Sequence, residues 1–135
     1  MRNRGSLVVT VHGRRSRRVI IPPELVSSDR VLQRWAVSIG SGLPTDFWDD
    51  ATQSRVPPLD DDTARIVDQL VMRSPPRKVR RIIMLWYRTP EPVEHIAEKI
   101  KDSPENTALR VIAALCYMSL KFKENLHPKL TRILR

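Results

Sequence analysis

The chain has 135 residues, of which 41% are hydrophobic, which is enough for one compact domain with a buried core and excludes a chain disordered throughout. It carries 24 Lys and Arg against 15 Asp and Glu, which gives a net charge of +9 and a pI near 10.6. A single cysteine excludes an intrachain disulfide framework, and no apolar run approaches the roughly 18 residues of a membrane span. We therefore expect a cytoplasmic protein without membrane contact. Its charge favours a nucleic-acid partner, and a solvated basic surface that serves solubility is the alternative.

The charge is arranged in blocks along the chain. Residues 1–35 carry eight basic and two acidic groups, and residues 36–62 carry one basic and six acidic groups. Residues 63–90 carry seven basic groups against one acidic group, and residues 91–135 carry eight against six. Two basic blocks separated by an acidic one predict two basic surfaces that face an anionic partner.

The first block contains a predicted N-terminal arm, residues 1–22, that forms a short β-hairpin. Residues 7–11 and 19–21 are mostly β-branched, and Pro22 and Pro23 end the second run because proline cannot continue a β-ladder. The connection between the runs is rich in arginine, and its side chains are candidates for contact with nucleic acid or polymerase: Arg14, Arg15, Arg17 and Arg18. Two strands alone are marginal in water, so the hairpin packs on the helices or is ordered by a partner.

Residues 23–135 predict a helical domain. Apolar residues with helical spacing indicate a first helix from Pro23 to about Ile39, with Ser28 or Asp29 as its N-cap. The tryptophans are expected to anchor the core rather than to stack on bases: Trp35, Trp48 and Trp86.

An acidic segment follows over residues 40–62. Its Gly, Pro and Asp residues predict a long irregular connection, with Phe47 and Trp48 as its large apolar anchors. The chain then turns helical again after the three consecutive aspartates that end at Asp62. We expect Asp62 to cap this second helix, which ends at Ser74 before two prolines.

Three helical segments then follow closely and predict a helix-turn-helix over about residues 77–120. The first, residues 77–88, has apolar side chains on one face and basic side chains on the other. The second, residues 92–100, is two turns long, and residues 101–103 form a short turn into a third helix that runs to about Lys121. A turn of this length directs the start of the third helix towards the major groove of DNA.

The side chains expected at the start of the third helix suit base recognition, because Asn pairs with adenine, Arg with guanine and Glu with cytosine. These candidate base-reading residues are Glu105, Asn106, Thr107 and Arg110. The preceding helix would lie along the phosphates. Paired short helices also occur in domains that never touch DNA. The third helix is moreover apolar on nearly every side, so it is expected to be buried or to face a protein partner. Cys116 within it is expected to be a buried, inert thiol.

The segments 74–87 and 92–100, together with Ser103, resemble the DNA-binding fourth region of bacterial sigma factors. More closely, residues 31–120 resemble the late-gene antitermination Q proteins of lambdoid phages, in particular the phage 21 branch. The order of features carries the resemblance: a Trp-containing segment that ends at a Gly-rich stop, an Arg-Ile-Val-Asp helix, Pro-Pro-Arg, and the sigma-like motif. The resemblance assigns the phosphate contacts to Arg77, Lys78, Arg80, Arg81, Lys99, Lys101 and Ser103.

The function that this resemblance implies is transcription antitermination in a host bacterial cytoplasm. Such a protein binds double-stranded DNA near a late promoter, loads onto a sigma-containing RNA polymerase, and stays by the nascent RNA at the exit channel. The alternatives are a repressor or activator that binds DNA as a symmetric dimer, and a module that binds only proteins. Self-association is compatible with each of them.

No arrangement of residues typical of catalysis is present. The sequence has no Ser-His-Asp arrangement, no Gly-rich phosphate loop and no His-x-Glu zinc signature, and Cys116 and the three histidines lack the spacing of zinc ligands. We therefore expect no enzymatic activity, no cofactor and no metal.

Overall fold

The computed structural model describes residues 8–10, 19–38, 48–49, 54–55, 57–88, 92–125 and 127–134. For residues 8–10, 48–49 and 54–55 the backbone alone is described. The described chain is mainly helical, as the sequence predicts, and consists of six α-helices with four short strands.

Two strands precede the helices. Strand β1 (Val8–Thr10) pairs antiparallel with strand β2 (Val19–Ile21). Val19 and Ile21 are buried and Ile20 is 47% exposed, because successive side chains of a strand point to opposite faces. Strand β2 contacts α5, so the pair packs on the helices. The predicted contact residues between the strands lie outside the described residues: Arg14, Arg15, Arg17 and Arg18.

Helix α1 (Val26–Ser38) follows a 3-10 turn, η1 (Pro23–Leu25). Proline fixes a helical φ and needs no hydrogen bond in a first turn, so the helical geometry begins at Pro23. Ser28 and Asp29 consequently lie inside the helix, where they are 3% and 2% exposed. The prediction that one of them is the N-cap is therefore wrong.

A buried hydrogen-bond network explains the position of Asp29. The Tyr87 hydroxyl donates to Oδ1 of Asp29 at 2.6 Å, and Nε2 of Gln33 donates to Oδ2 at 2.8 Å. Buried polar groups need such partners because their desolvation is costly. The network joins α1 to a segment 58 residues further along the chain.

Strands β3 (Trp48–Asp49) and β4 (Ser54–Arg55) pair antiparallel within the predicted acidic segment. The Phe47 and Trp48 side chains lie outside what is described. The Arg34 guanidinium donates to the carbonyls of Pro57 and Pro58 at 3.3 and 3.2 Å, which holds the end of this segment on α1.

Helix α2 (Asp61–Arg73) begins one residue after Asp60. Oδ1 of Asp60 accepts from the Thr63 amide at 2.8 Å, so Asp60 is the N-cap and the prediction of Asp62 is wrong. Each of the three consecutive aspartates has a side chain that can cap a helix, so residue type alone does not choose between them. Asp60 takes the role because its backbone is extended (ψ 163°), whereas Asp62 is already helical.

Helix α3 (Arg77–Ile83) continues into a π-helical turn, η2 (Met84–Arg88). Trp86 and Tyr87 of this turn are both buried, at 0% and 2% exposed. Tyr87 is the residue whose hydroxyl reaches Asp29.

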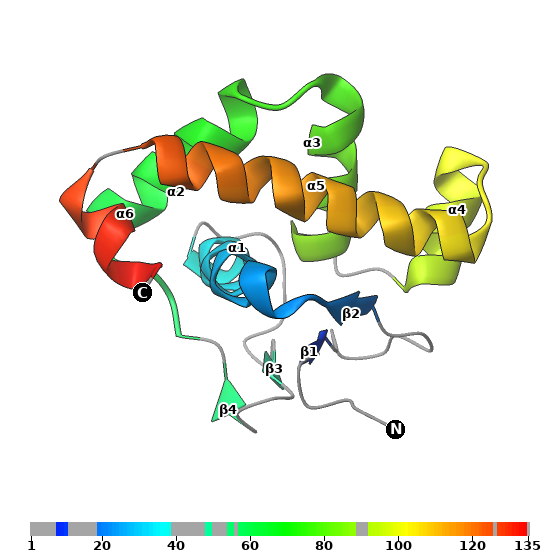
Figure 1. Ribbon diagram of the computed structural model, residues 1–135, viewed down its shortest axis with the longest axis horizontal. Coiled ribbons are helices and arrows are strands. Elements are labelled where there is room, and N and C mark those ends of the chain that lie inside the picture. Colours follow the sequence, from blue (N-terminus) through cyan, green and yellow to red (C-terminus); the bar gives the residue numbers. More distant parts are fainter. Residues whose placement is uncertain are drawn as a thin grey trace.

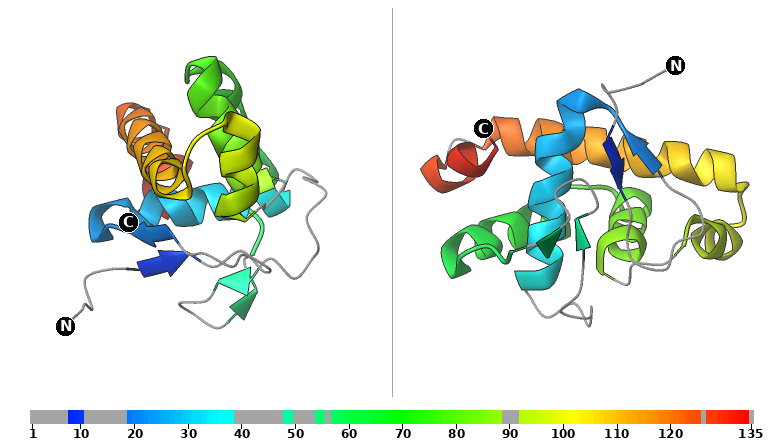
Figure 2. Two further views of the ribbon diagram at one scale, coloured as in Figure 1. Left: turned by 90° about the vertical axis from the view of Figure 1, so that its right-hand side faces the viewer. Right: turned by 90° about the horizontal axis from the view of Figure 1, so that it is seen from below.

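Three helices complete the chain: α4 (Val93–Ile100), α5 (Pro104–Glu124) and α6 (Pro128–Ile133). Helix α5 is the longest and runs across the whole molecule, with α4 at its N-terminal end and α6 at its C-terminal end (Figure 1). Helices α2 and α3 lie above α5 in Figure 1, and α1 and β2 lie below it. In the side view, α3 and α4 lie to one side of α5 and α1 lies below it (Figure 2).

The core fills the space between α5 and these helices. Trp35 and Trp86 are fully buried in it, as predicted. Leu130 of α6 is also fully buried, and Nζ of Lys129 lies 2.8 Å from Oδ2 of Asp62, so α6 docks on the start of α2. Among the described residues, no helix has the length and apolar character needed to cross a membrane.

Candidate nucleic-acid interface

The turn between α4 and α5 has a defined geometry. Lys101 adopts a left-handed conformation (φ 58°, ψ 54°), the one positive φ among the described non-glycine residues. The Asp102 amide donates to the Ala97 carbonyl at 3.0 Å and the Lys101 amide to the Glu98 carbonyl at 3.3 Å. These are the two hydrogen bonds of a Schellman motif, which ends α4 and reverses the chain direction within three residues.

The start of α5 is capped by Ser103, as predicted. Its Oγ accepts from the Asn106 amide at 3.1 Å, and Pro104 occupies the first helical position. The Thr107 hydroxyl donates to the Ser103 carbonyl at 2.8 Å, and Thr107 is 0% exposed. Thr107 therefore cannot reach a base, and its prediction as a reading residue is wrong. A short polar side chain one turn beyond a cap turns back onto the backbone.

Asp102 holds two exposed polar side chains in the first two turns of α5, those of Asn106 and Arg110. Its Oδ2 accepts from Nε of Arg110 at 2.7 Å, and its Oδ1 accepts from Nδ2 of Asn106 at 3.1 Å and from the Ser103 amide at 2.8 Å. The hydrogen bond from Arg110 is the main cause that lowers the pKa of Asp102, followed by those from Ser103 and Asn106. The sequence prediction missed Asp102. Its spacing of four and eight residues from Asn106 and Arg110 was the signal.

Asn106 and Arg110 lie on one flank of α5. The Tyr117 hydroxyl donates to the Ser74 carbonyl at 2.7 Å, which turns this flank towards the connection between α2 and α3. Arg110 precedes Tyr117 by seven residues, about two helical turns, and so shares its flank. Glu105 is also exposed but lies roughly 140° from Arg110 around the helix, so it does not share a face with it.

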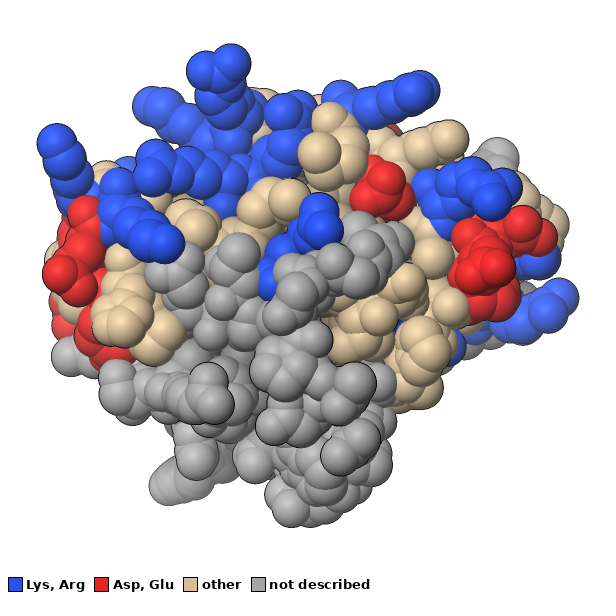
Figure 3. All heavy atoms as spheres, turned by 180° about the vertical axis from the view of Figure 1, so that it is seen from behind, with Lys and Arg blue, Asp and Glu red and all other residues tan. Residues whose placement is uncertain are grey.

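Basic side chains lie beyond that flank. Seen from behind, the upper edge of the molecule over α2 and α3 is dominated by Lys and Arg side chains (Figure 3). Among the predicted phosphate contacts, Arg77, Lys78 and Arg81 of α3 are exposed. A terminal nitrogen of Arg81 donates to the Lys99 carbonyl at 3.3 Å, which joins α3 to α4.

Arg80 departs from this pattern. It is half-buried, and its terminal nitrogen donates to the Pro75 carbonyl at 3.2 Å. Its Nε is buried as well. The guanidinium therefore holds the α2–α3 connection, and the prediction that Arg80 lies on the exposed basic face is wrong.

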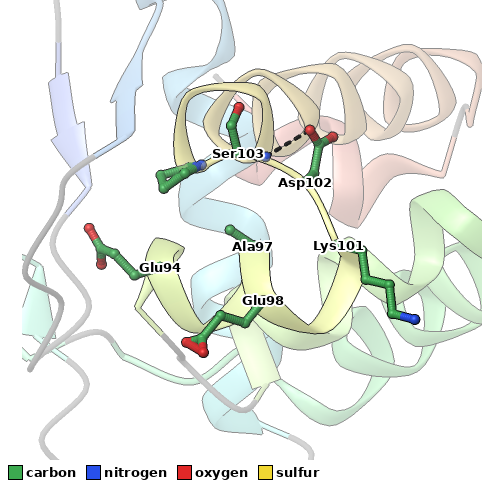
Figure 4. Close-up of a pocket in the computed structure, with 7 residues that line it drawn as sticks. Glu94, Ala97, Glu98, Lys101, Asp102 and Ser103 are labelled. Atoms are coloured by element: carbon green, nitrogen blue, oxygen red, sulfur yellow. Dashed lines mark hydrogen bonds between the residues drawn. The ribbon is translucent and has the colours of Figure 1, made fainter.

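Two of the remaining predicted phosphate contacts, Lys101 and Ser103, line an acidic depression. It has a volume of about 650 Å³ on the outer side of the α4–α5 turn and is lined by Glu94, Ala97, Glu98, Lys101, Asp102, Ser103 and Pro104. Glu94 and Glu98 project from α4 on the open side, and Asp102 faces the Ser103 backbone (Figure 4). Because three carboxyl groups line it, the depression disfavours a phosphate next to Ser103 and Lys101. Lys99 is exposed on the same helix.

Helix α5 divides into a buried face and an exposed apolar seam. Val111, Leu115 and Met118 are buried, whereas Leu109 and Leu120 are 63% and 61% exposed. Cys116 is exposed within this seam, so the prediction of a buried thiol is wrong. An apolar run alone does not tell which apolar side chains a domain covers.

No family model, no curated protein and no solved structure matches the chain. What the fold and the site define is a mainly helical domain in which a capped helix start, two organised polar side chains and a basic edge lie together.

Proposed function

We propose that this protein is a transcription antitermination factor that binds double-stranded DNA through α3, the α4–α5 turn and the start of α5, and that engages RNA polymerase. One observation carries the DNA-binding part: Asn106 and Arg110 are exposed on a single flank of α5, at a capped helix start, beside the exposed basic side chains of α3. The antitermination part rests on the resemblance of residues 31–120 to the phage 21 branch of Q proteins.

Base reading is assigned to Asn106 and Arg110. Arg110 is held through its Nε, and the pair of terminal nitrogens on its guanidinium matches the paired acceptors of a guanine edge. Asn106 is held through the same carboxylate and offers its amide to adenine. An anchored side chain loses less conformational freedom on binding than a mobile one, so Asp102 supports recognition without touching DNA.

Phosphate contacts are assigned to Arg77, Lys78 and Arg81. They lie on the edge adjoining the flank of Asn106 and Arg110, so one duplex meets both groups. Arg and Lys on the adjoining helix position a duplex without reading its sequence.

The experiment that tests DNA reading starts from a duplex selected by the protein from a random pool. We expect Asn106→Ala and Arg110→Ala each to weaken binding to that duplex by about 1–3 kcal/mol, roughly 5- to 150-fold. Arg132→Ala on α6 is the matched control, because Arg132 is exposed and lies away from this flank. Equal losses on selected and random duplexes for Asn106 and Arg110 contradict base reading at α5.

Antitermination is tested separately by transcription with purified bacterial RNA polymerase and its sigma factor. The template carries the selected duplex near the promoter and a terminator downstream. We expect readthrough that requires the protein and the site on the same template. DNA binding without readthrough assigns the protein to ordinary repression or activation.

A further inference from the structure

We infer that the exposed seam of α5 pairs antiparallel with the same seam of a second copy of this chain. The proposal goes beyond DNA binding and does not depend on it. It rests on two features of α5: the order of side-chain sizes along the seam and the charges at its two ends.

The seam consists of Leu109, Ala113, Cys116 and Leu120, all exposed. Leu109 and Leu120 are the most exposed large hydrophobic side chains of the described residues. Their spacing of four, three and four residues forms one stripe along a helix, the pattern of a helix–helix contact. Few soluble domains leave such a stripe uncovered along about three turns.

The order of sizes in the seam is the same in both directions. It is large, small, small, large, so a twofold axis beside the midpoint of the seam places Leu109 opposite Leu120 of the second copy. The same axis places Ala113 opposite Cys116. Small side chains at the centre let two helices approach to the 8–10 Å typical of packed helices, and the leucines fill the space where the helices diverge.

The charges at the two ends also favour antiparallel pairing. Glu105 and Lys123 are 18 residues apart, which is five turns, so both lie on the same edge of the seam about 27 Å apart. The twofold axis brings Glu105 of each copy beside Lys123 of the other, and it does so twice. A parallel pair would instead place Glu105 level with Glu105 and Lys123 level with Lys123 on opposite edges, so neither charge would meet an opposite one. The antiparallel arrangement also opposes the two helix dipoles.

The second copy leaves the proposed DNA flank uncovered. Asn106 and Arg110 lie on the edge of α5 that Tyr117 marks by its hydrogen bond to Ser74, whereas Glu105 and Lys123 lie on the opposite edge. A twofold axis of this orientation keeps each edge on its own side of the pair. Asn106 and Arg110 of both copies therefore face the same side.

The first experiment measures the mass of the full chain by sedimentation over a concentration series, without DNA. We expect a monomer–dimer equilibrium that Leu109→Glu and Leu120→Glu each shift to monomer. Both leucines are mostly exposed, so both variants should keep the helix content of the wild type, and its melting temperature at concentrations low enough for the wild type to be monomeric. A wild-type chain that stays monomeric, or dimers that survive both variants, overturn the proposal.

A charge exchange tests the antiparallel direction. Glu105→Lys and Lys123→Glu each place like charges together and should weaken the dimer, and the double variant should restore it towards wild type. A double variant no better than the two single variants overturns the antiparallel arrangement.

Cys116 provides a direct probe of distance, because it is the single cysteine of the chain. We expect a short bis-maleimide to link two copies through Cys116. The matched control is Cys116→Ala with Gln69→Cys, which moves the one thiol to an exposed position on α2 and reports random collision. Equal yields from the two proteins overturn the proposal.

Discussion

The hydrogen bond from Tyr87 to Asp29 should contribute measurably to stability, and the chain contains its own control. Tyr87 and Tyr117 are its two tyrosines, and each donates a hydroxyl hydrogen bond, at 2.6 Å to Asp29 and at 2.7 Å to the Ser74 carbonyl. Tyr87 is 2% exposed and Asp29 is 2% exposed, whereas Tyr117 is half-buried. Removal of the Tyr87 hydroxyl leaves a buried carboxyl group with one partner fewer, whereas water can replace the hydroxyl of Tyr117.

The expected size follows from these environments. A lost hydrogen bond to a buried carboxyl group costs about 1–3 kcal/mol, and one to a solvent-accessible carbonyl about 0.5–1.5 kcal/mol. A chain of this size has an unfolding entropy of roughly 0.28 kcal/mol per degree near its midpoint, so a loss of about 2 kcal/mol lowers Tm by about 7 °C.

The assay is urea unfolding of Tyr87→Phe and Tyr117→Phe beside the wild type, followed by circular dichroism. We expect a clearly larger loss for Tyr87→Phe, with an unchanged dependence on denaturant. If Tyr87→Phe loses no more stability than Tyr117→Phe, the reasoning about the buried network is refuted.

Two further predictions concern the ends of α4 and α6. Lys101→Gly should raise the free energy of unfolding by up to about 1 kcal/mol, because a residue with a side chain is strained in the left-handed region and glycine is not. Binding to DNA should not improve. A loss of stability would contradict the turn geometry. The ion pair with Lys129 lowers the pKa of Asp62 and raises that of Lys129, so its contribution is present at neutral pH. That contribution is lost as pH falls through the lowered pKa of Asp62, or rises through the raised pKa of Lys129. Lys129→Gln should therefore return the pKa of Asp62 towards 3.8. The measurement is an NMR titration of the Asp62 carboxyl carbon. An unchanged titration would show that α6 does not hold Asp62.

The order of helices could be predicted from the sequence because their ends are encoded locally. The Ser103 cap, the proline after it and the two prolines after Ser74 act within one turn of the chain, so spacing alone locates them. Local signals fail where several residues satisfy the same rule. Asp60 and Asp62 are the same residue type, and the backbone conformation decides which of them caps the helix.

Features that depend on distant contacts could not be predicted from spacing. In the sequence Asp29 has the appearance of a helix cap, because its buried partner Tyr87 lies 58 residues further along the chain. Cys116 sits among apolar residues, yet exposure depends on which face of α5 the other helices cover. In the candidate site, the sequence located Asn106 and Arg110, whereas the burial of Thr107 and the role of Asp102 required the fold.

The central claim, that the basic edge beside α5 binds DNA, is tested most directly by the salt dependence of binding to a random duplex. We expect log affinity to fall steeply with log salt, and Arg81→Ala to reduce the slope by about 0.9, the value of one phosphate contact. Arg132→Ala should leave the slope unchanged. A flat salt response of the wild type, or equal slopes for wild type and Arg81→Ala, contradicts the account.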